Sequence, residues 1–229
     1  MRDFPLGAVL HRRIRLSGRI RRVACTAVNR AWTAAQEYGR ISKDSPAGLR
    51  FAHFGDHACI AFPSGAIFGE PWIAIGDGTL IGAQVSLSAG FVPGQDLGTG
   101  LVVDIGKRCA IGRGSHIVGH SSIRIGDDVF IAPYAYITDQ NHTYADPDKP
   151  IGGQWPQNVP VSIGDGSWIG TGAVILPGVI VGANCVVAGG AVVRGQFPDH
   201  CVIAGVPARI VRRYDPDLGW QSVSAAPVA

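Results

Sequence analysis

The sequence has no apolar run as long as a membrane span, no Cys-x-x-Cys pair and no Gly-x-Ser-x-Gly string. The first absence argues against a transmembrane helix. Without a Cys-x-x-Cys pair, the chain lacks the usual spacing of a zinc site or a redox dithiol. Without a Gly-x-Ser-x-Gly string, it lacks the nucleophile elbow of serine hydrolases. Charged residues are scattered through the first twenty-two positions, which predicts no secretory signal. The five cysteines are odd in number and widely spaced, so we expect buried, reduced thiols of a cytoplasmic protein.

Charge is unevenly distributed along the chain. Residues 1–50 hold eleven Lys and Arg against three Asp and Glu, a balance of +8, so the total of +3 leaves −5 for the remainder. Four arginines share one stripe of a helix and a set of apolar residues shares another: Arg12, Arg15, Arg19 and Arg22; Leu16, Ile20, Val23, Ala27 and Ala31. This pattern predicts a basic, helical extension over residues 1–55, without a nucleic-acid-binding motif. It either covers one end of the fold or meets anionic lipid or an acidic partner.

An aliphatic residue returns every six positions in the second half of the chain. The six residues in phase are Ile163, Ile169, Ile175, Val181, Val187 and Val193. Helices repeat near 3.6 residues and strands near 2.0, so a sustained period of six fits neither. It is typical of a parallel β-helix of hexapeptide repeats, whose three short strands make one coil of about eighteen residues.

The same period appears in three earlier blocks. Their members are Ile75, Ile81 and Leu87; Ile105, Ile111, Ile117 and Ile123; Ile125, Ile131 and Ile137. The fold class is therefore all-β, with about six coils between residues 73 and 198 inside a domain over residues 56–208. We expect the period-six residues to fill the interior and the small residue after each to permit a tight corner. Both ends need covers. We expect an α-helical one from the N-terminal extension and a short C-terminal segment over residues 209–229, whose tail after Asp215 is low in core-forming residues and mobile.

Three interruptions break the repeat and are expected to project at corners. Eight residues separate Ile117 from Ile125, which predicts a small kink near His120. Residues 91–101 carry Pro and Thr at aliphatic positions and predict a surface loop. Residues 138–160 have no aliphatic rhythm at all, and long loops in regular folds are disproportionately functional.

The long loop contains the best candidates for chemistry. His142 can act as a general base, because an imidazole accepts a proton from a hydroxyl near neutral pH. Asp139 can bond the other ring nitrogen and orient it, and Asn141 lies beside them. A loop histidine satisfied by the backbone is the alternative interpretation of the same residues.

Two strings give the sequence a family resemblance. Residues 165–170 (DGSWIG) and 203–209 (IAGVPAR), together with the repeats behind them, resemble the hexapeptide-repeat acyltransferases with a left-handed parallel β-helix. The most similar members are sugar O-acetyltransferases: galactoside, maltose and nodulation acetyltransferases and those of colanic acid or O-antigen. The resemblance covers residues 70–213 and is not specific to a substrate.

The resemblance implies an acetyl-CoA-dependent O-acyltransferase with a carbohydrate acceptor and no metal. It implies a homotrimer with a site in each groove between neighbouring subunits, and His142 as the base. The hydroxyl then attacks the thioester directly, and backbone N–H groups stabilise the oxyanion. By position in the motifs, Trp168 borders both substrates, Thr171 and Gly189 touch the pantetheine arm, and Arg209 and Arg212 approach the nucleotide.

The sequence departs from the family pattern at two positions. Tyr134 replaces an asparagine that often binds the acceptor, and Gly195 replaces a lysine, leaving Arg194 beside it as the phosphate contact. His116 and His120 also suggest a zinc site shared across a trimer, but their spacing does not match the zinc carbonic anhydrases of this fold. We place both near the acceptor instead.

Other functions stay open at the level of sequence. A xenobiotic or serine acetyltransferase has the same coil, and a β-helix can also serve as a non-catalytic assembly module. His142 and the 203–209 string disfavour the module. These patterns do not specify which sugar is the acceptor or whether the donor carries an acetyl, succinyl or another short acyl group. They also do not specify whether residues 1–50 contact a membrane.

Overall fold

The computed structural model describes residues 18–223, and the chain divides into two compact units, residues 1–38 and 39–229. The first unit holds the helix α1 (Gly18–Gly39), which confirms the predicted helix and has no buried residue. Arg12, Arg15 and Leu16 of the predicted stripes lie outside the described residues. Whether α1 covers an end of the coil therefore stays a prediction. Among residues 18–223, no helix has the length and apolar character needed to cross a membrane.

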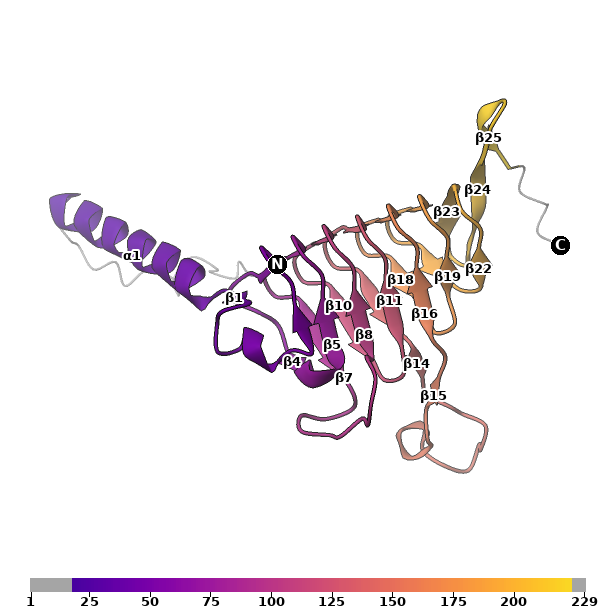
Figure 1. The fold of residues 1–229 in the computed structure, drawn as a ribbon, viewed down its shortest axis with the longest axis horizontal. Coiled ribbons are helices and arrows are strands. Elements are labelled where there is room, and N and C mark those ends of the chain that lie inside the picture. The colour runs from indigo at the N-terminus through magenta and orange to yellow at the C-terminus, as the bar shows by residue number, and fades with distance from the viewer. Residues whose placement is uncertain (1–17, 224–229) are drawn as a thin grey trace, which may run out of the picture. The chain divides into compact units, whose positions relative to one another are not determined.

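The second unit is a left-handed parallel β-helix built from three sheets (Figure 1). Sheet A contains, in spatial order, β1 (Ile41–Ser42), β3 (Cys59–Ile60), β6 (Leu80–Ile81), β9 (Ala110–Ile111), β12 (Phe130–Ile131), β17 (Trp168–Ile169), β20 (Val186–Val187), β23 (Cys201–Gly205), β24 (Ala208–Asp215) and β25 (Gly219–Ser222). Sheet B contains β2 (His53–Phe54), β5 (Ile73–Ile75), β8 (Val103–Ile105), β11 (Ile123–Ile125), β16 (Val161–Ile163), β19 (Ile180–Val181) and β22 (Gln196–Phe197).

Sheet C and the remaining short elements complete the unit. Sheet C contains β4 (Ile67–Phe68), β7 (Ser86–Ala89), β10 (His116–Gly119), β13 (Tyr136–Thr138), β18 (Val174–Ile175) and β21 (Val192–Val193). A separate two-stranded sheet pairs β14 (Gln140–Asn141) with β15 (Gln157–Asn158). Three 3₁₀ helices are η1 (Gly48–Arg50), η2 (Glu70–Trp72) and η3 (Ile151–Gly153).

Each coil passes through sheets B, A and C in turn, and the first coil begins at His53. Six coils are complete, and β22 and β23 begin a seventh. The coil thus starts some twenty residues before the regular repeat at Ile73. The expected boundary at residue 55 falls inside the first coil, just after its first strand. The repeat is hidden there because aromatic Phe54 replaces an aliphatic residue; it packs edge-on against Phe51 at 5.2 Å.

The period-six residues fill the interior, as the repeat predicts. Every one of them is buried: Ile75, Ile81, Leu87, Ile105, Ile111, Ile117, Ile123, Ile125, Ile131, Ile137, Ile163, Ile169, Ile175, Val181, Val187 and Val193. Parallel pairing puts equivalent residues of successive coils side by side, as Ile111, Ile131 and Ile169 show. One continuous apolar core therefore runs through all the coils.

The corner glycines after these residues are needed for a reason that differs from the expected one. Gly106 does not adopt a positive φ. A Cβ built on Gly106 would instead lie 2.5 Å from the carbonyl carbon of Gly126 in the next coil. Close stacking of one corner on the next, and not left-handed backbone, excludes a side chain at this position.

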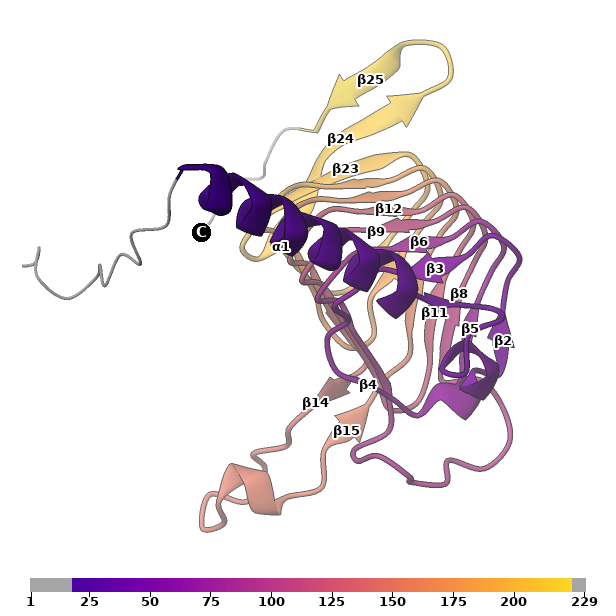
Figure 2. The ribbon, with the colours of Figure 1, turned by 90° about the vertical axis from the view of Figure 1, so that its left-hand side faces the viewer.

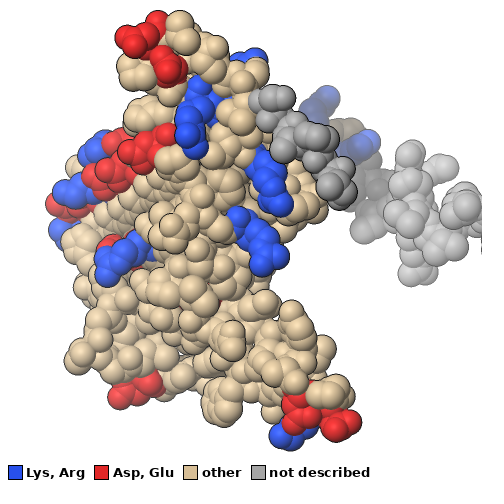
Figure 3. Space-filling model, turned by 90° about the vertical axis from the view of Figure 1, so that its right-hand side faces the viewer, with Lys and Arg blue, Asp and Glu red and all other residues tan. Residues whose placement is uncertain are grey.

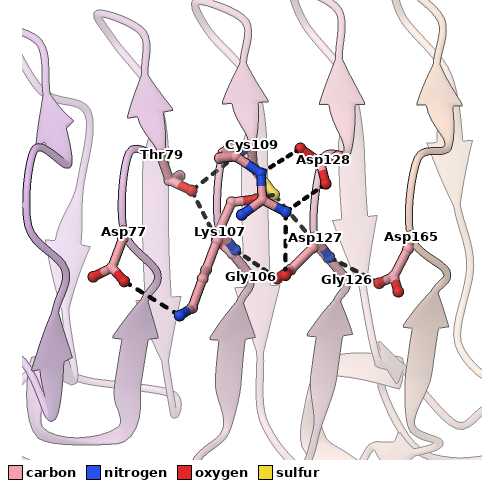
Figure 4. Close-up of polar contacts among 10 residues, drawn as sticks. Asp77, Thr79, Gly106, Lys107, Cys109, Gly126, Asp127, Asp128 and Asp165 are labelled. Atoms are coloured by element: carbon pink, nitrogen blue, oxygen red, sulfur yellow. Dashed lines mark hydrogen bonds and ion pairs between the residues drawn. The ribbon is translucent and has the colours of Figure 1, made fainter.

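Side chains bridge the coils at the corner between sheets B and A (Figure 4). The Asp127 carboxylate accepts the N–H of Lys107 at 2.8 Å, and Asp165 accepts the N–H of Asp127 at 2.8 Å. Inside the same corner, the Thr79 hydroxyl donates to the carbonyl of Gly106 and accepts the N–H of Cys109. These bonds satisfy backbone groups that the turn leaves unpaired.

The cysteines fall into two groups. Cys109, Cys185 and Cys201 are buried and free, which confirms the prediction for these three. The Cys109 thiol occupies a place in the internal ladder and donates to the carbonyl of Gly126 at 3.1 Å. Burial raises the pKa of the Cys109 and Cys185 thiols. For Cys25, which is exposed on α1, and Cys59, which is half-buried, the prediction of burial is wrong.

The outward faces of sheets A and B differ in character. One outward residue of each strand of sheet A pairs with the next coil's to form an apolar row: Cys59, Leu80, Ala110, Phe130, Trp168, Val186 and Val202. The equivalent row of sheet B is mostly polar: His53, Ala74, Asp104, Arg124, Ser162, Ile180 and Gln196. Acidic and basic side chains gather along one edge of the coil (Figure 3).

The C-terminal segment is more regular than expected. Strands β24 and β25 extend sheet A antiparallel from β23, and Tyr214 packs against Trp220 at 5.6 Å between ring centres. The tail after Asp215, predicted to be mobile, is thus a strand over Gly219–Ser222. Composition predicted mobility because this segment has few core-forming residues. Strand pairing and the contact between the two aromatic rings order it instead. Residues 224–229 lie outside the described residues.

Candidate functional site

The three interruptions of the repeat meet at one corner of the coil. Ala89 of β7 lies opposite Gly119 of β10, and Val118 lies opposite Thr138 of β13. The segments that follow these three strands therefore leave the coil at the same corner, between sheets C and B. Figures 1 and 2 both show residues 91–101 and the β14–β15 arm projecting there. The predicted kink near His120 and the surface loop 91–101 are both confirmed.

The predicted loop 138–160 is a short hairpin arm with a 3₁₀ turn. β14 and β15 pair antiparallel, and the Val159 N–H donates to the carbonyl of Asp139 at 2.7 Å. The Gln140 side chain donates to the Asn158 side chain at 3.1 Å. Farther out, Gln154 bonds to the backbone of residues 146 and 149. These bonds give an otherwise irregular segment a defined shape.

A cavity of about 640 Å³ lies between this arm and the coil. Its lining residues are Phe91, Val118, His120, Tyr136, Thr138, Gln140, His142, Gly152, Gly153, Gln154, Trp155 and Pro156. The candidate base His142 follows β14 directly and its side chain is exposed. One wall is the coil, another is the loop 91–101, and the arm forms the third. Volume and mixed lining suit a small organic ligand.

Asp139 stands behind this cavity, fully buried. Its carboxylate accepts the N–H groups of His120 at 2.8 Å, Ser121 at 2.6 Å and Ser122 at 2.7 Å. Burial by itself would raise the pKa of Asp139, but the contact with His120 and these N–H donors outweigh it and lower the pKa below its usual value. Asp139 thus holds the kink of the preceding coil. It forms these bonds in place of the expected bond to His142.

The ring of Phe91 covers His120 and links it to Trp155. Phe91 lies 4.7 Å from the His120 ring, centre to centre, and meets Trp155 edge-on at 6.3 Å. His120 is nearly buried, with a side chain 7% exposed, whereas Trp155 is 83% exposed at the rim. The loop 91–101, the kink and the arm therefore contact one another through rings.

The other predicted site residues lie elsewhere on the coil. Asn141 is on β14 but does not line the cavity, and His116 is exposed on sheet C with its ring 6.4 Å from that of Tyr136. Tyr134, beside Arg113, and Thr171 and Gly189 stand at the corner between sheets A and C. Trp168 is exposed on sheet A and stacks with Phe130 at 6.5 Å. Arg194 follows β21, and Arg209 and Arg212 lie on β24.

Sequence reasoning missed Phe91, Tyr136 and Trp155 as cavity residues. The register of the coils could have found them, because it brings loops after β7 and β13 to one corner. To find that register from the sequence, one has to align strands on either side of an interruption. The alignment succeeds only if the inserted residues are all assigned to the corner between sheets C and B. Among residues 18–223, no group of three or more His, Cys, Asp or Glu is placed to hold a metal. The prediction of no metal stays a prediction.

The hexapeptide repeats of the chain match known family models. Its sequence matches the family described as "Bacterial transferase hexapeptide (six repeats)" over residues 160–195. It also matches the "Hexapeptide repeat of succinyl-transferase" over residues 102–138. These two segments lie on either side of the arm, so the arm itself interrupts an otherwise matching coil.

Known proteins of this kind are similar to the chain over the coil. WbbJ of Escherichia coli, provisionally named an O-acetyltransferase of lipopolysaccharide biosynthesis, is 38% identical over 107 residues, which are 44% of this chain and 55% of WbbJ. Galactoside O-acetyltransferase of Escherichia coli is 32% identical over 130 residues, 57% of this chain and 63% of that enzyme. The chain thus spans a little over half the length of these curated relatives.

A solved structure supports the fold. AntD, an N-acyltransferase from Bacillus cereus in complex with dTDP and 3-hydroxybutyryl-CoA, superposes with a TM-score of 0.63 over 78% of this chain and 91% of AntD. The two sequences are 19% identical. At that identity the likeness concerns the β-helix and does not carry over ligands or residue roles.

Proposed function

We propose that the protein is an acyl-CoA-dependent acyltransferase that transfers a short acyl group to a hydroxyl of a carbohydrate, with His142 as the general base. The observation that carries the proposal is the cavity at the C–B corner. It is lined by His142 and His120 and lies where every interruption of the coil converges. Relatives named as O-acetyltransferases support the reaction class.

The reaction requires one proton transfer in each direction. His142 takes the proton of the acceptor hydroxyl as its oxygen bonds to the thioester carbonyl carbon. The tetrahedral oxyanion collapses, the carbon–sulfur bond breaks, and the coenzyme A thiolate receives the proton from His142. No acyl-enzyme forms, so no serine or cysteine nucleophile is needed. The His142 side chain is exposed at the rim of the cavity, so two substrates can reach it.

We further propose that three copies assemble with the sites between them. In one chain, Trp168 lies on sheet A and does not line the cavity that holds His142. Thr171 and Gly189, which are predicted to bind acyl-CoA, lie at the A–C corner, whereas the predicted base His142 lies at the C–B corner. Contact between neighbouring copies would bring these residues into one site. The exposed apolar row of sheet A is the kind of surface that such contact buries.

His142→Ala tests the base directly. We expect thiol release from acetyl-CoA to fall about 10²- to 10⁴-fold in kcat, the range that general base catalysis supplies, with unchanged coenzyme A affinity and thermal unfolding. The matched control is His53→Ala, the same change on the outward row of sheet B, which should retain activity. Turnover near the wild-type rate in His142→Ala would overturn the assignment of the base.

The acceptor class is tested by a screen of thiol release. Acetyl-CoA and succinyl-CoA are each offered with monosaccharides, oligosaccharides, lipid-linked sugars, amino sugars, serine and a xenobiotic alcohol. We expect release with hydroxyl sugars. Release with an amino sugar alone would make the enzyme an N-acyltransferase, and serine or xenobiotic turnover would establish the alternative acetyltransferases. No turnover and no coenzyme A binding would favour the assembly module.

A further inference from the structure

His120 carries an unusual polar atom in the wall of the cavity. Its side chain is 7% exposed, under the ring of Phe91. Among residues 18–223, its Nδ1 is the one fully buried side-chain nitrogen or oxygen that has no hydrogen-bond partner. Unsatisfied buried polar atoms are rare in folded proteins and often mark a group reserved for a ligand or for catalysis.

The carboxylate of Asp139 lies next to this atom. Its Oδ1 is 3.5 Å from the Nδ1 of His120, too long for a well-formed hydrogen bond. The carboxylate is itself immobile, because the N–H groups of residues 120–122 hold both of its oxygens. A small rotation of the imidazole closes the gap. Since an ionised carboxylate only accepts hydrogen bonds, the nitrogen that faces it has to carry the ring proton.

Several other polar groups of the cavity are already engaged. Thr138 accepts the N–H of Gln140, and the side chain of Gln140 donates to Asn158. The Gln154 side chain bonds to the backbone of the arm. Within the described chain, the ring nitrogens of His120 and His142 form no hydrogen bond. These two rings are therefore among the groups left to bind polar atoms of a ligand, together with the Tyr136 hydroxyl and the Trp155 indole N–H.

We propose that Asp139 fixes His120 as the Nδ1–H tautomer, so that Nε2 accepts a hydrogen bond from a second hydroxyl of the acceptor that His142 activates. The inference rests on the proposed function, because the acceptor occupies this cavity. It makes His120 a residue that orients the acceptor and Asp139 a positioning residue that acts through it. The acceptor class becomes a polyol, such as a sugar ring with two free hydroxyls, and a simple alcohol is excluded.

The tautomer is testable without any substrate. Long-range ¹H–¹⁵N spectra of protein labelled at histidine report which ring nitrogen carries the proton, and His120→Gln assigns the resonance. We expect neutral His120 as Nδ1–H in the wild-type protein and Nε2–H in Asp139→Asn, with the His142 signals unchanged. Nε2–H in the wild-type protein overturns the proposal. Should Asp139→Asn fail to fold, the wild-type and His120→Gln spectra still decide.

The role toward the acceptor is tested by kinetics with defined sugars. Methyl β-galactopyranoside and methyl β-glucopyranoside are compared with their monodeoxy analogues as acceptors of acetyl-CoA. For His120→Ala we expect the KM of the acceptor to rise about tenfold or more, because a buried hydrogen bond is lost, with the KM of acetyl-CoA unchanged. His120→Gln, whose carbonyl can accept the same bond, should recover part of the loss.

The two variants separate this proposal from the proposed function. Wild-type enzyme should discriminate against one deoxy analogue and His120→Ala should not, because a site built to bond a hydroxyl rejects the analogue that lacks it. A fall in kcat like that of His142→Ala, or an unchanged acceptor KM, would overturn the orienting role. Absence of transfer to any sugar would instead count against the proposed function, and the tautomer measurement would remain decisive for His120 and Asp139.

Discussion

At the scale of single residues, the buried carboxylate of Asp139 accepts the N–H groups of the kink at the C–B corner and also faces the ring of His120. Asp139 was expected to orient His142, but its carboxylate holds the N–H groups of the neighbouring kink. The sequence placed both residues in one loop correctly. It could not assign the bond, because the partner of Asp139 belongs to a coil nearly twenty residues earlier and becomes adjacent only by stacking.

Replacing Asp139 by Asn should destabilise the coil in a pH-dependent way. The lowered pKa means that the folded state prefers the ionised carboxylate, so its contribution is present above the unfolded pKa of about 3.9 and is lost as pH falls through that range. We expect a loss of about 1–3 kcal/mol in the free energy of unfolding near pH 7, the cost of leaving buried donors poorly paired.

Urea unfolding of the two proteins between pH 7 and pH 3 measures this difference. The gap between wild type and Asp139→Asn should narrow as the pH approaches the acid limit, since a protonated carboxyl resembles the amide. Asp96→Asn, a change of the same type on the exposed loop 91–101, serves as the control and should have little effect at any pH. A gap that stays constant across this range would contradict the electrostatic account.

At the scale of elements, the repeat predicted the strands of the coil far better than its ends. Where one residue points inward at every sixth position, the pattern is local and the sequence contains it. The first coil escaped because Phe54 is aromatic and because Ile60 lies fifteen residues before Ile75, out of phase with the later repeat. The C-terminal hairpin escaped because its stability comes from pairing and from the contact of Tyr214 with Trp220. The arm was predicted as a loop, but its hairpin depends on side-chain bonds between its two ends.

The helix α1 offers an element-scale prediction about membranes. Its arginines and its small apolar residues occupy different arcs, and residues 1–50 carry a balance of +8 from eleven basic and three acidic residues. We therefore expect the full chain to co-sediment with vesicles of phosphatidylcholine and phosphatidylglycerol more than with phosphatidylcholine alone. Salt should weaken the binding by screening the arginines.

Two variants that add the same charge separate the arcs of α1. Val23→Glu places a carboxylate among the apolar residues and should abolish vesicle binding. Gln36→Glu places it on the polar arc and should weaken binding only modestly. Equal binding to both vesicle types, or equal loss in both variants, would refute a role for the amphipathic arc, and no binding by the wild-type chain would leave α1 to protein contacts.

At the scale of the whole molecule, the separation of predicted substrate residues makes assembly part of the proposal. We expect sedimentation equilibrium to give a mass near three times the 24.0 kDa of the chain. Phe130→Glu, in the exposed apolar row of sheet A, should weaken assembly and activity together, because it puts a charge where apolar contact is buried.

Gln196→Glu is the matched control for assembly, since it adds the same charge to the outward row of sheet B. It should leave the mass unchanged. A wild-type protein that sediments as a single chain and still transfers acyl groups would contradict sites shared between copies. A trimer that survives Phe130→Glu would move the contact away from this row of sheet A.

The sequence by itself determined the interior, the coil and the position of the long loop in the chain. Those features follow from short-range periodicity, in which each residue's distance from the last inward one sets whether it is buried. Only the tertiary structure decided that the loop 91–101, the kink at His120 and the β14–β15 arm share one corner. It also decided that Asp139 faces His120. These contacts join residues from different coils. Which residues meet depends on the length of every insertion that precedes them, and therefore on the register of the whole β-helix and not on any local pattern.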